Sequence, residues 1–320
     1  MRALIREVTD VKPKWNVIVV GGIDSDYLIR GKTLPPPGQT VEGEVFLEGP
    51  GGKGANQAVG AARLGARVAI VGRVGLDSRG EAIVEYLRRE RVGTQYIVHD
   101  EHVETGAALI MLDHRGQKQI LTVPGANAEL TMYDVLRAER AIRTARVLLV
   151  QLEVPIGAVE EALRIARAYG LRTILDPAPP RLLEKSILQK VDLIKPNAQE
   201  AEILTGIKVI DRSTARLAAD RLLCEGVQAV AIQAGGEGNL LVWPGGEYWF
   251  PKIPLEAIDA TGAGDAFAGA LAFGLAAQKS LVDTVRIANA AAALRTTKLG
   301  SQAALAKMHE VQNLLAKQAA

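Results

Sequence analysis

Short apolar runs rich in β-branched residues alternate along the chain with longer segments in which apolar residues recur at helical spacing. The first run, 15–20, ends at two glycines and is typical of a buried central strand. The alternation predicts further strands and helices over residues 68–74, 79–89, 147–152, 155–169, 173–176, 191–195, 198–204 and 229–233. This order favours an α/β fold with a doubly wound, mostly parallel sheet and helices on both faces.

Two pairs of β-rich segments depart from this alternation. One lies within 27–48, where three consecutive prolines rule out a helix, and the other comprises 105–112 and 117–123. We expect both pairs, from about 26–48 and 103–123, to form a small β-sheet lid that closes over a ligand and excludes water. A hairpin at 240–250 and helices at 281–294 and 303–320 complete the prediction. Residues 1–14 are expected to be a flexible arm, and 15–320 a single domain.

The stretch 259–270, Asp-Ala-Thr-Gly-Ala-Gly-Asp-Ala-Phe-Ala-Gly-Ala, joins a glycine-rich turn to an apolar helix. Gly262 and Gly264 allow a tight turn and the close approach of a ligand to the backbone. A helix that starts here has free N–H groups, which attract a phosphate or a developing negative charge. Asp265 at this junction is either a first-turn carboxylate that caps the helix or a general base beside an anion site.

Other polar residues stand at the ends of predicted strands. Asp24 and Asp26 follow the first strand, and Glu153, Asp176, Asn197 and Glu200 follow later ones. In an open α/β sheet this edge is where ligands bind, although each residue alone could be a turn or cap residue. Lys53 and Asn56 open a predicted helix after a glycine-rich turn, but the G-x-x-x-x-G-K-[ST] spacing of a phosphate loop is absent. Their groups are better suited to a hydroxylated ligand.

The composition excludes few classes of function. The net charge is +2 and basic and acidic residues are interleaved, which gives no indication of nucleic acid or membrane as a partner. No apolar run reaches the roughly 18 residues of a membrane helix, and the N-terminus lacks a signal-peptide pattern, so we expect a cytoplasmic protein. The single cysteine, Cys224, is expected to be buried and inert, and the four histidines form no metal-ligand pattern.

Two stretches, Gly51-Gly-Lys-Gly-Ala-Asn-Gln-Ala58 and Asp259-Ala-Thr-Gly-Ala-Gly-Asp265, resemble the two signatures of the ribokinase-like (PfkB) carbohydrate kinase family. The resemblance runs from about residue 17 to about residue 300. It implies an ATP-dependent sugar kinase that transfers the γ-phosphoryl group to the primary hydroxyl of D-ribose and gives D-ribose 5-phosphate. It also implies that Asp265 is the general base, with the amides of Gly262, Ala263 and Gly264 as an anion hole.

The resemblance assigns further residues to three groups. The sugar would be held by Asp24, Asp26, Gly52, Lys53, Asn56, Glu153 and Asp265. ATP, with Mg²⁺, would be held by Asn197, Glu200, Gln233, Gly235, Gly238, Gly264 and Asn289. A potassium ion, as monovalent activator, would be held by Asp259, Thr261, Arg295, Lys298 and Gly300.

Three residues depart from the family pattern. Asp24 stands where Asn is usual, and a carboxylate accepts hydrogen bonds but cannot donate them as an amide does. Gln233 replaces a Thr or Ser of the nucleotide site, and Ala304 replaces a serine of the cation site.

Other functions stay open at this point. The substitution at Asp24 keeps a nucleoside kinase, or a kinase of another furanose, as the alternative. The intact Asp265 and its glycines argue against a sugar-binding or regulatory protein that has lost catalysis. The absence of G-x-G-x-x-G after the first strand argues against a dinucleotide-dependent oxidoreductase. The resemblance also implies a homodimer formed through the lid strands, and the apolar residues Val41, Val45 and Leu47 on one face of a lid strand fit it.

Overall fold

The computed structural model describes residues 14–234 and 237–319. The predicted arm, residues 1–14, lies outside the described residues apart from Lys14, and so does Gly235.

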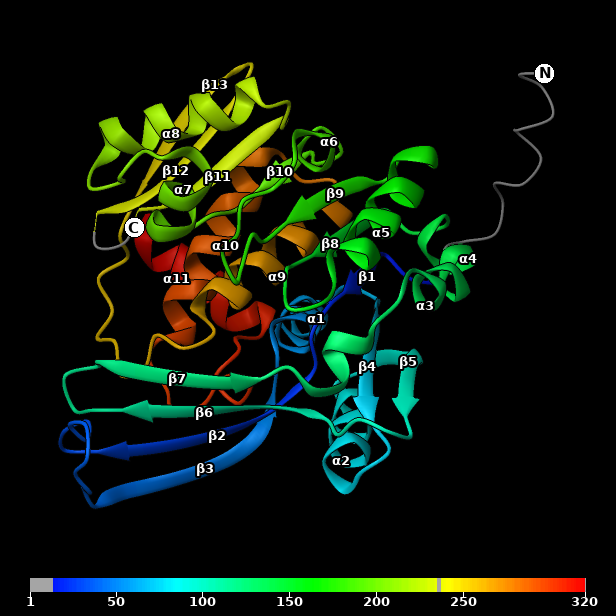
Figure 1. Ribbon diagram of the computed structural model, residues 1–320. Helices are drawn as coiled ribbons and strands as arrows, with labels where there is room; N and C mark the ends of the chain where they lie inside the picture. Colours follow the sequence, from blue (N-terminus) through cyan, green and yellow to red (C-terminus); the bar gives the residue numbers. More distant parts are fainter. Residues whose placement is uncertain (1–13, 235–236, 320) are drawn as a thin grey trace.

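A nine-stranded sheet forms the centre of the molecule (Figure 1). Its strands, in spatial order, are β13 (Gly246–Pro251), β12 (Gly238–Trp243), β11 (Ala229–Gln233), β10 (Leu193–Ile194), β9 (Arg172–Leu175), β8 (Val147–Val150), β1 (Val17–Val20), β4 (Val68–Gly75) and β5 (Val92–Asp100). Seven adjacent strands from β11 to β5 are parallel, whereas β12 runs antiparallel to both of its neighbours. The predicted doubly wound, mostly parallel fold is confirmed.

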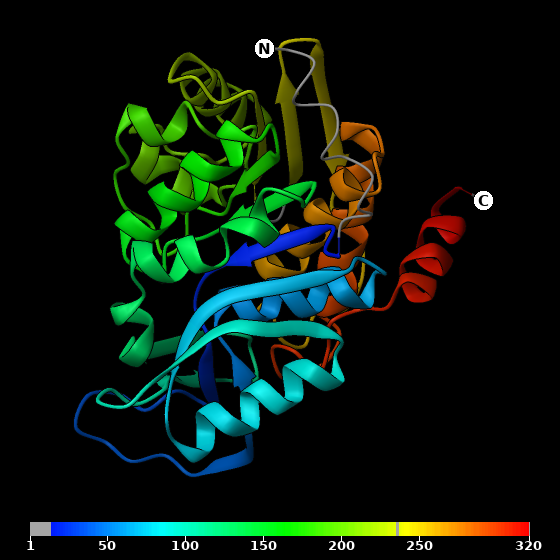
Figure 2. The same cartoon turned by 90° about the vertical axis from the view of Figure 1, so that its right-hand side faces the viewer.

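Helices cover both faces of the sheet, as the view in Figure 2 shows. One face is covered by α1 (Lys53–Arg63), α2 (Ser78–Arg89), α9 (Ala263–Ala276), α10 (Leu281–Arg295) and α11 (Met308–Ala319). The other is covered by α3 (Met132–Arg137), α4 (Glu139–Ile142), α5 (Ile156–Ala168), α6 (Lys185–Leu188), α7 (Ala198–Thr205) and α8 (Arg212–Cys224).

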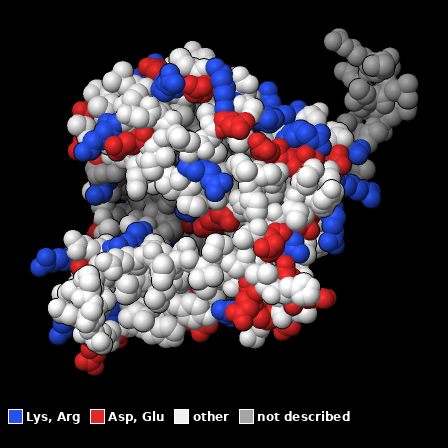
Figure 3. All heavy atoms as spheres, viewed as in Figure 1, with Lys and Arg blue, Asp and Glu red and all other residues white. Residues whose placement is uncertain are grey.

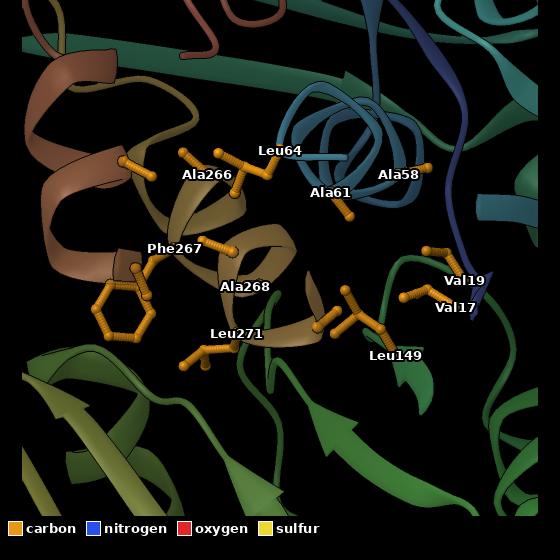
Figure 4. Packing of buried hydrophobic residues seen from close by; sticks show 14 of the residues in the cluster. Val17, Val19, Ala58, Ala61, Leu64, Leu149, Ala266, Phe267, Ala268 and Leu271 are labelled. Carbon is orange, nitrogen blue, oxygen red and sulfur yellow. The ribbon is translucent and has the colours of Figure 1, made fainter. Parts of the chain in front are cut away.

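The core follows from the alternation of side chains along each strand. In β1, Val17 and Val19 point to the side of α1 and α9, and Ile18 and Val20 point to the side of α3 and α5. All four are fully buried, which explains why this strand reads as a continuous apolar run. Figure 4 shows Val17 and Val19 close to the small and branched side chains of α1 and α9. The two helices therefore pack firmly on the central strands.

A second, four-stranded sheet projects beside the main body (Figure 1). Its order is β3 (Gly43–Gly51), β2 (Asp24–Gly31), β6 (Gly106–Leu112) and β7 (Lys118–Val123). Parallel pairing of β2 with β6 joins the two predicted strand pairs into one sheet. Because β2 begins four residues after β1 ends, the small sheet grows from the edge of the main sheet where its central strands end. The predicted small sheet is confirmed.

Several details differ from the predictions, among them the short helices α3, α4 and α6, which were not predicted. The strand β5 was not predicted, because its alternating pattern follows α2 without a turn residue other than Gly93. The last helix begins at Met308 instead of residue 303. Cys224 is exposed at the end of α8, so the prediction of a buried thiol is wrong. Among the described helices, none has both the length and the apolarity of a membrane span.

Candidate active site

The carboxylate of Asp265 lies in the first turn of α9, behind a turn that only glycine adopts easily. Gly262, the residue that precedes the helix, has φ of 78°, in the left-handed region. Helix α1 approaches α9 closely at Gly269, where a Cβ atom would lie 2.6 Å from the carbonyl oxygen of Gln57. This close packing brings the first turn of α1 against Asp265.

Three side chains of α1 converge on Asp265. The amide of Asn56 donates to Oδ2 at 3.0 Å, and the amide of Gln57 donates to Oδ1 at 3.1 Å. The Nζ atom of Lys53 lies 3.8 Å from Oδ1. Asp265 is 4% exposed. Because both of its carboxylate oxygens accept hydrogen bonds, the carboxylate is fixed in one orientation. Lys53 and Asn56 were predicted for the site, whereas Gln57 was not.

Two cavities meet at this carboxylate. One, of about 580 Å³, is lined by all of the residues predicted to bind the sugar: Asp24, Asp26, Gly52, Lys53, Asn56, Glu153 and Asp265. The other, of about 630 Å³, is lined by the described residues predicted to bind ATP: Asn197, Glu200, Gln233, Gly238, Gly264 and Asn289. Both cavities are lined by Lys53, Lys118, Gly262 and Asp265. Figure 3 shows the hollow between the main body and the small sheet.

The first cavity concentrates carboxyl groups that resist ionisation. Burial and then the charge of the neighbouring Asp26 raise the pKa of Asp24 to about 7, against a hydrogen bond from Asn127. Burial also raises the pKa of Asp26 to about 6, against a hydrogen bond donated at 2.7 Å by Ser301. The pKa of Glu153 is raised well above its ordinary value by burial and then by Asp24. A carboxyl group that keeps its proton can donate a hydrogen bond, so these side chains can both donate to and accept from a hydroxylated ligand.

Lys53 supplies the opposing charge at the junction. Burial lowers its pKa, but Asp265, Asp176 and Glu153 outweigh burial and raise the pKa above the ordinary value. The backbone N–H of Lys53 donates to Glu153 at 2.7 Å, which ties the start of α1 to the loop after β8. Lys53 therefore remains a cation between the two cavities.

On the side of the second cavity, Asn197 and Glu200 bind each other at the start of α7. The side chain of Asn197 accepts from the backbone of Glu200 at 2.8 Å, and the Glu200 carboxylate accepts from the backbone and the amide of Asn197, both at 2.7 Å. This is a capping box, so the interpretation of both residues as helix caps is correct. They also line the cavity, and capping fixes their orientation there.

The rest of the second cavity combines glycines with amides. A Cβ atom at Gly264 would lie 3.1 Å from Nζ of Lys195 and 3.7 Å from Oε1 of Gln233, so the absence of a side chain keeps this cradle open. Gly238 has φ of 139°. The amide of Asn239 donates to Oδ1 of Asn289 at 2.6 Å.

A buried polar network that the sequence did not reveal is linked to Asp265 through the amide of Gln57. Nζ of Lys195 donates to Oδ1 of Asp176 at 3.0 Å, and the amide of Gln57 donates to Oδ2 of Asp176 at 2.8 Å. The side chains of Lys195 and Asp176 are 3% and 0% exposed. The sequence identifies Asp176 only as a polar residue at the end of a predicted strand. Gln57 stands inside the first signature stretch, which was the available signal.

Asn127 is a second residue that sequence reasoning missed. Its amide donates to Oδ1 of Asp24 at 2.6 Å and to the carbonyl of Ile23 at 3.1 Å, and its Oδ1 accepts from the Ile23 N–H at 2.8 Å. Asn127 therefore fixes both the backbone and the carboxyl group at the start of β2. Nothing in its sequence context, Gly-Ala-Asn-Ala, marked it.

The residues predicted to hold a monovalent cation come together, but their oxygen atoms are bonded to a side chain of the set itself. The guanidinium group of Arg295 donates from Nη1 to the carbonyls of Asp259 and Lys298, at 3.2 and 3.0 Å, and from Nη2 to Oδ2 of Asp259 at 3.2 Å. Asp259 also accepts from the N–H groups of Thr261 and Gly300, at 2.8 and 3.2 Å. A carboxylate and carbonyls that already bind a guanidinium do not fit the ligand set of a free ion.

Comparison with known proteins agrees with this geometry. The family model for pfkB family carbohydrate kinases matches residues 16–308. Ribokinase of Haemophilus influenzae is 36% identical over 297 residues, which are 93% of this chain and 97% of that protein. Ribokinase of Bacillus subtilis is 37% identical over 300 residues, or 94% and 99% of the two chains.

A solved structure of Arabidopsis thaliana ribokinase complexed with ribose and ATP matches with a TM-score of 0.84 at 29% identity, and covers 94% of this chain and 98% of that chain. The chain belongs to the pfkB family of carbohydrate kinases.

Proposed function

We propose that this kinase transfers the γ-phosphoryl group of ATP to the primary hydroxyl of D-ribose and releases D-ribose 5-phosphate. The observation that carries the proposal is the position of Asp265, where a cavity lined by carboxyl and amide groups meets a second cavity lined by glycines and a helix start. The ribokinases to which the chain is similar, one of them solved with ribose and ATP, support these two substrates.

Asp265 is proposed as the general base. Asn56 and Gln57 donate to its two oxygens and hold the carboxylate in one orientation, in which it can accept the proton of a hydroxyl bound in the first cavity. A positioned base of this kind contributes about 10²–10⁴-fold to the rate. The proton passes to Asp265 as the hydroxyl oxygen attacks the γ-phosphorus, and ADP leaves with the bond electrons.

The first-turn amides of α9 are proposed as the anion hole. Residues 262–264 precede or open the helix, where backbone N–H groups lack intrahelical partners and the helix dipole favours negative charge. Charge that develops on the transferred group would be stabilised there, with Lys53 beside it. Ile110 and Ile120 of the small sheet line the first cavity and would exclude water when the sheet closes on the sugar.

Magnesium is proposed to accompany ATP in the second cavity, and the residues there fit it. Burial raises the pKa of Glu200, against the charge of Lys195, so a cation would favour this carboxylate in its ionised form. Mg²⁺ is commonly held by one or two carboxylates together with substrate phosphates, without a dedicated protein cage. Glu200 would hold the ion, oriented by Asn197, and the bound ion would neutralise charge on the phosphates. EDTA should abolish turnover, and Glu200→Gln should raise the Mg²⁺ concentration needed to restore it.

The substrate is tested by measuring ADP release with ribose, deoxyribose, fructose and purine nucleosides. We expect ribose to give the highest kcat/KM. Another furanose or a nucleoside is the second candidate substrate, because of the buried Asp24, which Asn127 binds. The protonation state of Asp24 decides whether it donates a hydrogen bond to a substrate hydroxyl or only accepts one. A clear preference for a nucleoside would overturn the assignment of ribose.

A homodimer formed through the small sheet is also proposed. Phe46, Leu121 and Val123 on its strands are at least 60% exposed, and β3 and β7 are its edge strands. Exposed apolar residues on a sheet of this kind favour association. Light scattering that gives the mass of a single chain would contradict this. We also propose a cytoplasmic location, because the exposed thiol of Cys224 suits a reducing compartment with available ATP; cell fractionation tests it.

A further inference from the structure

The guanidinium group of Arg295 occupies the centre of the residues that the family resemblance assigned to a monovalent cation. Its side chain is 0% exposed, and so is that of Asp259, with which it forms an ion pair at 3.2 Å. Three acceptor atoms bind it: two backbone carbonyls and one carboxylate oxygen. An acid together with carbonyl dipoles is the kind of ligand set that a potassium ion requires.

We infer that the Arg295 side chain replaces the monovalent cation in this protein, so that catalysis does not depend on potassium. Asp259 is the one carboxylate among the five residues assigned to the cation. Its charge is already compensated by Arg295, and its two oxygens also accept from Thr261 and Gly300. A second cation placed here would compete for the same acceptors and be repelled by the guanidinium.

The electrostatics support a permanent charge at this place. Burial of Asp259 raises its pKa, but the hydrogen bonds from Thr261 and then the charge of Arg295 outweigh burial, and the pKa falls below the ordinary value. Burial lowers the pKa of Arg295 below its ordinary value, although Asp259, Asp265 and Asp26 oppose that change. An arginine is not deprotonated in proteins, so the pair stays charged.

Arg295 also adjoins the proposed anion hole. A Cβ atom at Gly262 would lie 3.3 Å from Nε of Arg295, so the guanidinium lies directly against the turn that opens α9. Nε is buried and has no hydrogen-bond partner among the described residues. Arg295 thus holds positive charge beneath the amides at which phosphoryl charge would develop. It is a positioning residue that acts through Asp259 and this turn.

The first test needs no variant: kcat and KM are measured in potassium chloride and in tetramethylammonium chloride of equal ionic strength. The wild-type kcat should differ by less than about twofold, because an ion without a site contributes nothing by mass action. Thermal unfolding in the same two salts should give the same Tm. A wild-type enzyme that potassium activates by an order of magnitude or stabilises specifically would overturn the inference.

The second test restores the proposed cation site. Arg295→Ala should lose at least about tenfold in kcat in tetramethylammonium, as expected for removal of charge beside an anion hole, and potassium should restore activity and raise Tm. Arg286→Ala is the matched control, because Arg286 lies on the same helix with an exposed side chain paired to Asp283. A folded Arg295→Ala that potassium neither activates nor stabilises would make Arg295 merely structural and would also overturn the inference.

The kinetic measurements rest on the proposed kinase function, whereas the unfolding measurements do not. If no sugar is phosphorylated, the proposed function fails, and the dependence of Tm on potassium still decides whether the chain binds the ion.

Discussion

Replacing Asp24 by asparagine should stabilise the protein above neutral pH and have a smaller effect in acid. Asparagine keeps an oxygen that can accept from Asn127 and removes a carboxyl group whose pKa is raised from 3.8 to about 7 by burial and by Asp26. The unfolded chain releases this proton near 3.8, so between the two values the folded state binds more protons. Wild-type stability is therefore lost as the pH rises through this window.

The magnitude follows from the same pKa values. A rise from 3.8 to about 7 corresponds to about 4 kcal/mol in total, since one pKa unit is worth about 1.4 kcal/mol. About 2–3 kcal/mol of this falls between pH 5 and pH 8, because the unfolded carboxyl group is already mostly ionised at pH 5. For a chain of this size that corresponds to a difference in Tm of about 5 °C.

Differential scanning calorimetry of both proteins at pH 5 and pH 8 measures this directly. The excess in Tm of Asp24→Asn over wild type should be about 5 °C larger at pH 8 than at pH 5. Glu202→Gln, which neutralises an exposed carboxylate on α7, is the matched control and should show no such change. An excess that is equal at the two pH values would refute the reasoning that Asp24 is protonated in the folded protein.

Two further substitutions test how the site is supported. Gly269→Ala should lower the free energy of unfolding by about 1–3 kcal/mol, and with it Tm, and should also lower kcat. The added Cβ would lie 2.6 Å from the Gln57 carbonyl and push α1 away from α9. The control Gly157→Ala, which has open space in α5, should raise Tm slightly, and an equal effect of both substitutions would contradict the packing argument. Lys195→Met should cost about 3–5 kcal/mol, because it leaves the carboxylate of Asp176 buried without its cation; chemical denaturation that gives less than about 1 kcal/mol would show that the pair is not essential to the fold.

The sequence predicts much of this site because its chemistry lies in short contiguous stretches. Lys53, Asn56 and Asp265 stand within two signatures, and the strand ends at Asp24 and Glu153 share one edge of the sheet by the rule for parallel strands. Once the order of strands and helices was read from the apolar pattern, these residues could be expected to meet.

Contacts that depend on side-chain direction could not be read in this way. The pairing of Lys195 with Asp176 requires β9 and β10 to be neighbours, and the reach of Gln57 to both aspartates requires the close crossing of α1 and α9 at Gly269. The family resemblance assigned Arg295 to the cation group, but only the structure places its guanidinium on the oxygens of that group. The only sequence feature that pointed to this contact was an arginine after the alanine-rich run 290–293.

The most direct test of the central claim is the kcat of Asp265→Asn with saturating ribose and MgATP, together with calorimetric binding of both ligands. The proposed mechanism predicts that kcat falls by about 10²–10⁴-fold while the dissociation constants stay within about tenfold of wild type, since the positioned base acts in the chemical step. Turnover close to that of the wild type would contradict the claim that Asp265, at the meeting point of the two cavities, is the catalytic base.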